Sequence, residues 1–93
     1  MIVYEAKYIA KKNGLFGMPD LDYERILGLF EDQAKAKAYL YAAIREVMRD
    51  FDCIEFEHSL QETVYPGGHD IEIILSLDNC CEIQGEIIAR PVY

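Results

Sequence analysis

The sequence lacks the long apolar segments, tandem repeats and biased tracts that would assign it to a membrane, solenoid or low-complexity class. Its longest strongly apolar run, Ile71–Leu77, is interrupted by Glu72 and Ser76. A membrane-spanning helix needs roughly 20 consecutive apolar residues. We therefore expect no membrane contact.

A secretory signal is also missing. The first residues, MIVYEAKYIAKK, place an apolar stretch before the lysines and contain no small-residue cleavage site, the reverse of a signal peptide. We therefore expect a cytoplasmic protein, in which Cys53, Cys80 and Cys81 are reduced. An odd number of cysteines with two adjacent is also a poor disulfide framework.

Motifs for catalysis, cofactors and metals are equally scarce. No G-x-G-x-x-G or G-K-[ST] phosphate loop is present, and the cysteines and histidines do not form the paired spacings of a zinc site. Cys53, Cys81 and His58 could converge only if strand registers happened to align. We expect no enzyme, cofactor or metal, and a small enzyme or metal protein stays open as the third alternative.

The bulk composition is that of a folded protein. The 93 residues are 52% hydrophobic and 28% charged, which is too apolar for a disordered chain. A chain of this length has room for one hydrophobic core. We therefore predict one domain covering residues 1–93.

Hydrophobic periodicity predicts the elements of this domain. Apolar residues alternate with polar ones in residues 2–11, 53–60, 71–78 and 81–90, which is typical of strands with one buried face. The ambiguous segment 22–30 is assigned to a strand that pairs back on the first. Residues 32–50 carry an apolar stripe at helical spacing, and Asp32 is placed to cap that helix.

The order of these elements predicts an α+β fold. One mostly antiparallel five-stranded sheet with chain order ββαβββ would have its single helix packed on one face. Tyr65-Pro66-Gly67-Gly68 and Asp78-Asn79 supply turn signals between the last three strands.

Charge is distributed unevenly along this order. Residues 1–49 hold seven acidic and eight basic residues, whereas residues 50–93 hold ten acidic residues and only Arg90. The net charges of the two parts, +1 and −9, add up to the −8 of the whole chain. Such an asymmetry suggests an interaction surface, and the net charge disfavours direct nucleic-acid binding.

Strand alternation predicts where the acidic residues lie. If the helix covers the apolar side, the other side carries carboxylates roughly 6.8 Å apart along a strand and about 4.8 Å apart between strands. Outward apolar residues, including Val3 and Ile9, would form a seam among them, while Lys7 and Lys11 would neutralise part of the array. The predicted partner-binding residues are Glu55, Glu57, Glu72, Asp78, Glu82, Glu86, Ile74 and Ile88.

These features lead to a hypothesis of function. A rigid array of carboxylates can occupy a basic groove that normally binds phosphates. We predict a non-enzymatic inhibitor or adaptor that engages a basic, nucleic-acid-binding surface of a partner protein, such as a phage or mobile-element inhibitor of a CRISPR effector. The alternative is a structural or assembly subunit, for example a homodimer, and an acidic face that is merely solvated also stays open.

Overall fold

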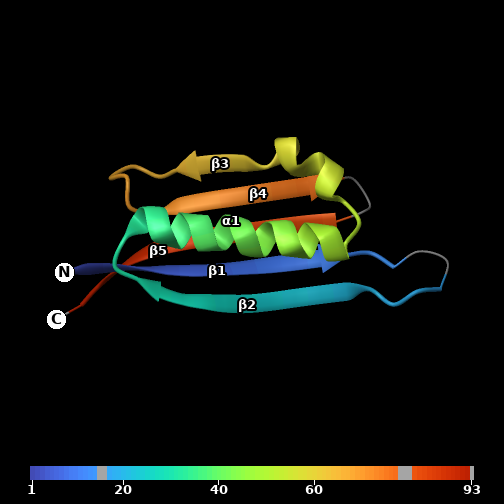
Figure 1. Cartoon of the computed structure of the whole chain (residues 1–93), viewed down its shortest axis with the longest axis horizontal. Helices are drawn as coiled ribbons and strands as arrows, with labels where there is room; N and C mark the ends of the chain where they lie inside the picture. The colour runs from blue at the N-terminus through green and yellow to red at the C-terminus, as the bar shows by residue number, and fades with distance from the viewer. Residues whose placement is uncertain (15–16, 78–80, 93) are drawn as a thin grey trace.

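The computed structural model, which describes residues 1–14, 17–77 and 81–92, contains a five-stranded sheet with a helix on one face (Figure 1). Its strands lie in the spatial order β2-β1-β5-β4-β3, and all neighbours are antiparallel. The predicted α+β fold is therefore confirmed. The elements are β1 (Ile2–Lys12), β2 (Leu21–Phe30), α1 (Gln33–Asp50), the 3-10 helix η1 (Ile54–Ser59), β3 (Gln61–Val64), β4 (Ile71–Leu77) and β5 (Cys81–Pro91).

The first and last strands pair at the centre of the sheet. β1 and β5 are in register from Ile2 opposite Pro91 to Lys12 opposite Cys81. β2 extends the sheet on one side of this pair, and β4 and β3 extend it on the other side. The pairing brings the two chain ends together (Figure 1), and the Val92 N–H donates to the Met1 carbonyl at 2.9 Å.

Local interactions at both ends determine the length of α1. The Asp32 side chain accepts a hydrogen bond from the Ala34 N–H at 2.8 Å, which confirms the predicted cap. At the other end, Asp52 has a φ of 59° and lies just beyond the helix. The Asp52 N–H donates to Arg49 and the Cys53 N–H to Met48, the hydrogen-bond pattern of a Schellman motif.

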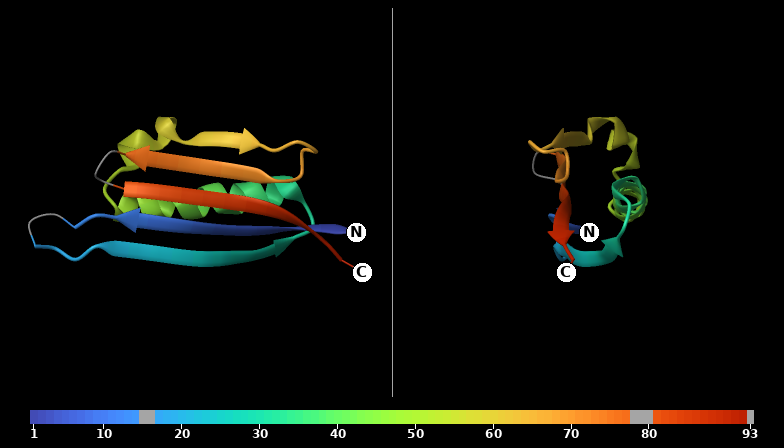
Figure 2. Two further views of the ribbon diagram at one scale, coloured as in Figure 1. Left: turned by 180° about the vertical axis from the view of Figure 1, so that it is seen from behind. Right: turned by 90° about the vertical axis from the view of Figure 1, so that its left-hand side faces the viewer.

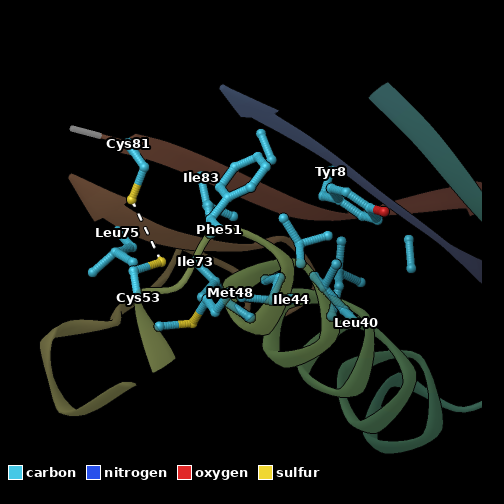
Figure 3. Packing of buried hydrophobic residues seen from close by; sticks show 14 of the residues in the cluster. Tyr8, Leu40, Ile44, Met48, Phe51, Cys53, Ile73, Leu75, Cys81 and Ile83 are labelled. Atoms are coloured by element: carbon cyan, nitrogen blue, oxygen red, sulfur yellow. Dashed lines mark hydrogen bonds between the residues drawn. The ribbon is translucent and has the colours of Figure 1, made fainter. Parts of the chain in front are cut away.

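The hydrophobic core lies between α1 and the inner face of the sheet (Figure 3). Leu40, Ile44 and Met48 of the helix are fully buried against alternate residues of β1, β4 and β5. Gly85 lets the helix approach β5 closely, because a Cβ at this position would lie 2.9 Å from Ile44 Cδ1. The predicted apolar stripe of the helix is therefore the side that packs on the sheet.

One predicted strand is wrong. Residues 54–59 form η1, and the third strand is the shorter segment Gln61–Val64. After the Schellman motif the chain coils into 3-10 turns, in which the Phe56 N–H donates to Cys53 and the Leu60 N–H donates to Glu57. Ile54, Glu57 and Leu60 are half-buried at a spacing of three, the repeat of a 3-10 helix. The apolar alternation of this short segment did not distinguish a strand from a 3-10 helix.

None of the helices in the described part of the chain is both long and apolar enough to cross a membrane.

Candidate functional site

The candidate functional site is the face of the sheet opposite α1. The end-on view in Figure 2 shows the helix on one side of the curved sheet, and no described element covers the other side. We call this side the open face. It consists of the outward residues of the five strands, and the strand register determines which of them are neighbours.

Three rows of side chains cross the open face. They are, in order from β2, Asp22–Lys11–Glu82–Ser76, then Glu24–Ile9–Gln84–Ile74–Gln61, and then Ile26–Lys7–Glu86–Glu72–Thr63. Leu29, Glu5 and Ile88 form a shorter fourth row, beyond which Val3 lies opposite Arg90. Directly opposed residues on adjacent strands are close enough to interact, so this register determines the electrostatics of the face.

Cations of β1 and β5 divide the predicted carboxylate array. Lys7 Nζ lies 3.7 Å from Glu86 Oε2, and Arg90 Nη2 donates to Glu5 Oε1 at 3.1 Å. Lys11 lies between Asp22 and Glu82 in its row. With six carboxylates and three cations among its described residues, the open face is acidic, at a net charge of −3, but it is a mixed surface.

The acidic residues of β4 and β5 are the densest part of the array. Glu72 lies directly opposite Glu86, and Gln84 Nε2 lies 3.3 Å from a carboxylate oxygen of each. Tyr65 follows β3 at this end of the sheet, and its pKa is raised by partial desolvation and then by the negative charge of Glu72 and Glu86. Two opposed carboxylates share one amide donor here, so this pair is only partly compensated.

Glu55 and Glu57 do not belong to the open face, and their predicted position is wrong. Both lie on η1, and Glu57 forms an ion pair with Arg45 of α1. The predicted strand over residues 53–60 would have aligned them with Glu72, but the 3-10 turns rotate them out of the sheet. Asp78 lies outside the described residues. Glu72, Glu82, Glu86, Ile74 and Ile88 do share the open face.

The apolar residues of the open face are interspersed with charge and do not form the predicted seam. Ile9 and Ile74 are separated by Gln84 in one row, and Ile88 lies beside Glu5 in another. Among the apolar side chains of the open face, the most exposed are on β2, where Ile26 is 66% and Leu29 63% exposed. A hollow of 270 Å³ beside Ile26 is lined in part by Ile9, Lys7 and Gln84.

The contribution of β2 to this surface was missed in the sequence because the alternation is interrupted there. The β1–β2 register shifts between Ala6 and Lys7, and Gly28 has a φ of 139°. This bulge places Ile26 and Leu29 on the open face although they are three residues apart, while Leu27 packs against the core. A glycine within an apolar strand pattern was the available signal.

A second polar cluster joins β3 to the helix on the covered side. Glu62 accepts hydrogen bonds from Lys37 Nζ at 3.0 Å and from the Tyr41 hydroxyl at 2.9 Å. The Lys37 hydrogen bond lowers the pKa of Glu62 despite some desolvation. Burial and the hydrogen bond to Glu62 raise the pKa of Tyr41 to about 12. These contacts attach the edge strand β3 to α1.

The cysteine and histidine residues considered for chemistry are divided between the core and the surface. Cys53 and Cys81 are buried with their sulfur atoms 3.6 Å apart (Figure 3). His58 is exposed on η1, and His69 Nδ1 lies 3.3 Å from the Tyr4 hydroxyl. Within the described ranges, no three side chains of histidine, cysteine, aspartate or glutamate come together as metal ligands.

Comparison of the chain with protein-family models, with curated proteins and with solved structures found no match. Function is therefore inferred from the surface itself.

Proposed function

We propose that this protein is a non-enzymatic protein-binding module that uses its open face to engage a basic surface of a partner protein. The observation that carries this proposal is the mixed character of the face, in which exposed Ile26 and Leu29 lie among charged rows. Protein interfaces combine apolar anchors with a polar surround.

Electrostatics supports a basic partner. The open face has a net charge of −3 within a chain of net charge −8, so a cationic surface is attracted over a distance of about one Debye length, roughly 8 Å at physiological salt. The opposed Glu72 and Glu86 lie in the centre of the acidic region. A cation from a partner would compensate the repulsion that remains after the contacts of Gln84 with both carboxylates and of Lys7 with Glu86.

The same attraction supports a role as an inhibitor or adaptor of a nucleic-acid-handling complex, because a cationic groove that binds phosphates also attracts carboxylates. The narrower case, inhibition of a CRISPR effector, stays a prediction from size and charge.

The test is a capture experiment with a matched pair of variants. The face variant Glu72→Gln/Glu82→Gln/Glu86→Gln and the control variant Glu31→Gln/Asp52→Asn/Glu55→Gln each lose three negative charges. The control residues are exposed and lie outside the bounds of the strands. The unmodified chain and the two variants are immobilised separately. Capture is then carried out at low salt, about 50 mM, and at high salt, about 500 mM. Captured proteins are identified and then retested in purified form.

The proposal expects a partner that binds the unmodified chain and the control variant, is released by high salt, and binds the face variant at least about tenfold more weakly. A partner that binds both variants equally, or whose binding does not depend on salt, contradicts the open face as the site.

A second candidate function is that of an assembly subunit in which two copies meet through their open faces. The exposure of Ile26 and Leu29 favours it, whereas the net charge of −3 on each face opposes it. Sedimentation equilibrium would show a dimer that Ile26→Lys/Leu29→Lys converts to a monomer. A monomeric unmodified chain at high protein concentration excludes this candidate.

A further inference from the structure

The outer edge of β2 is a long strand edge that no described strand pairs with. β2 and β3 are the two edge strands of the sheet (Figure 1). β3 has only four residues, whereas β2 has ten, and residues 21–26 precede its bulge in regular register with β1. In an edge strand, alternate residues direct their N–H and C=O groups away from the sheet, where they can pair with another chain.

A groove of 450 Å³ follows this edge between β2 and α1. Its walls are residues 22–25 of β2 on one side and Ala43, Glu46, Val47 and Asp50 of α1 on the other, with Tyr8 at the bottom. Consecutive strand residues point to opposite faces of a sheet. A groove that contacts four in succession therefore runs along the backbone edge itself.

The groove has an apolar bottom and an acidic rim. Tyr8 and Val47 are almost fully buried, and Tyr23 and Ala43 are half-buried. The rim consists of the carboxylates of Asp22, Glu24, Glu46 and Asp50 and the single cation Arg25.

The four rim carboxylates have no close polar partner in the described part of the chain, although Lys11 lies opposite Asp22 in the strand register. None of them forms an ion pair or a side-chain hydrogen bond with another residue in the described part of the structure. Asp22 and Glu24 lie on the open-face side of β2, and Glu46 and Asp50 lie on the helix. Negative charge therefore borders the free strand edge on both sides.

We propose that this groove binds an extended basic segment of a partner protein, which adds a sixth strand to the sheet along β2. Backbone hydrogen bonds to the edge provide the attachment, as in other cases of strand addition. Alternate side chains of the added strand lie over the apolar bottom, while its lysine or arginine residues reach the rim carboxylates. This surface is distinct from the centre of the open face, so the inference does not depend on the proposed function.

Charge complementarity selects this occupant over a second copy of the chain. Pairing two β2 edges would bring two acidic rims, each with four carboxylates and one arginine, against one another. Like charges facing each other across strands are destabilising. A basic segment instead neutralises carboxylates that form no ion pair among the described residues.

The test uses synthetic probe peptides and the ¹⁵N-labelled full chain. One acetylated peptide of about eight residues, an ordinary strand length, alternates lysine and valine. A second replaces lysine with glutamate, and a third replaces the two central valines with proline, which removes backbone donors. Affinity and hydrogen-exchange protection are measured at low salt for the unmodified chain and two variants. The groove variant is Asp22→Asn/Glu24→Gln, on the side of the strand edge that the lysines of the peptide reach.

The control variant Asp52→Asn/Glu55→Gln loses the same charge outside the groove. Asparagine tolerates the positive φ of residue 52, so the control preserves the Schellman motif. The proposal expects the lysine peptide alone to protect alternate amides within residues 21–26 of the unmodified chain. The groove variant should bind it about fivefold or more weakly and the control variant unchanged.

Three results would overturn the proposal. They are no binding of the lysine peptide, equal weakening by both variants, and equal binding of the proline peptide. Spectral changes confined to Glu72, Glu82 and Glu86 would also overturn it, because they would place the peptide on the centre of the open face. Concentration-dependent protection of residues 21–26 without peptide would assign the edge to a second copy and contradict the basic-segment assignment.

Discussion

Alternate residues of β1, β4 and β5 lie on the two faces of one sheet, and the two sets have opposite physical character. On the covered face, Ile73, Ile83 and Ile87 are fully buried under the helix. On the open face, the intervening positions carry Glu72, Glu82 and Glu86. Burial of apolar area stabilises the covered face, whereas opposed carboxylates oppose folding on the other. The comparison shows that folding constrains one half of each strand and leaves the other half available for binding.

The largest expected effect comes from placing the same side chain on each face of β5. Gly85→Val should lower the free energy of unfolding by about 1–3 kcal/mol, because its branches would collide with Leu40 and Ile44 of the helix. Gln84→Val, one residue away on the open face, should cost less, up to about 1 kcal/mol, because it removes only the long amide contacts with Glu72 and Glu86. Urea unfolding followed by circular dichroism measures both. Equal effects would show that the helix does not constrain one face alone.

A smaller effect is expected where polar groups hold β3 to the covered side. The folded-state pKa of Glu62 is lowered by Lys37, so the carboxylate stabilises the fold above the ordinary glutamate pKa and loses that effect as pH falls. Glu62→Gln should cost up to about 1 kcal/mol at neutral pH, as for a partly exposed pair. The difference between the two proteins should begin to shrink as pH falls below the ordinary glutamate pKa, about 4.3, and should disappear only below the lowered folded-state pKa of Glu62. Unfolding measured across this range tests it, and a constant difference would contradict the ion-pair origin.

The smallest effect has the opposite sign and concerns the open face. Glu72→Lys replaces a repulsion with Glu86 by an attraction across β4 and β5, and should raise the free energy of unfolding by about 0.2–1 kcal/mol. Added salt should reduce the gain. Glu72→Gln, which only removes the repulsion, should give a smaller gain. A loss of stability in both variants would show that Glu72 has a structural role that its neighbours do not reveal.

Much of the fold was predictable from local periodicity. Alternation in residues 2–11 and 81–90 predicted two strands with one buried face, and the stripe through Leu40, Ile44 and Met48 predicted the packed side of the helix. The segment 53–60 was not predictable in this way, because a few alternating residues are compatible with both a strand and a 3-10 helix. Placing Glu55 and Glu57 on the sheet failed for this reason.

The candidate site was predictable only in part, because side-chain neighbours on a sheet depend on register. The alternation of residues along β4 and β5 predicts that one side of these strands is acidic. It also predicts that Ile74 and Ile88 lie on that side. That Lys7 meets Glu86, and that the bulge at Gly28 exposes Ile26 on the same face, follows from pairing with distant strands. The partner-binding role of these residues stays a prediction for the capture experiment.

The sequence by itself therefore determined the elements with strong periodicity, the helix cap at Asp32 and the net charge, because these depend on residues close together in the chain. Tertiary structure alone decided which carboxylates are opposed, which are paired and which border the groove beside β2. The physical reason is that strand register and the position of the helix over the sheet come from contacts between residues distant in sequence. Local sequence patterns do not encode those contacts.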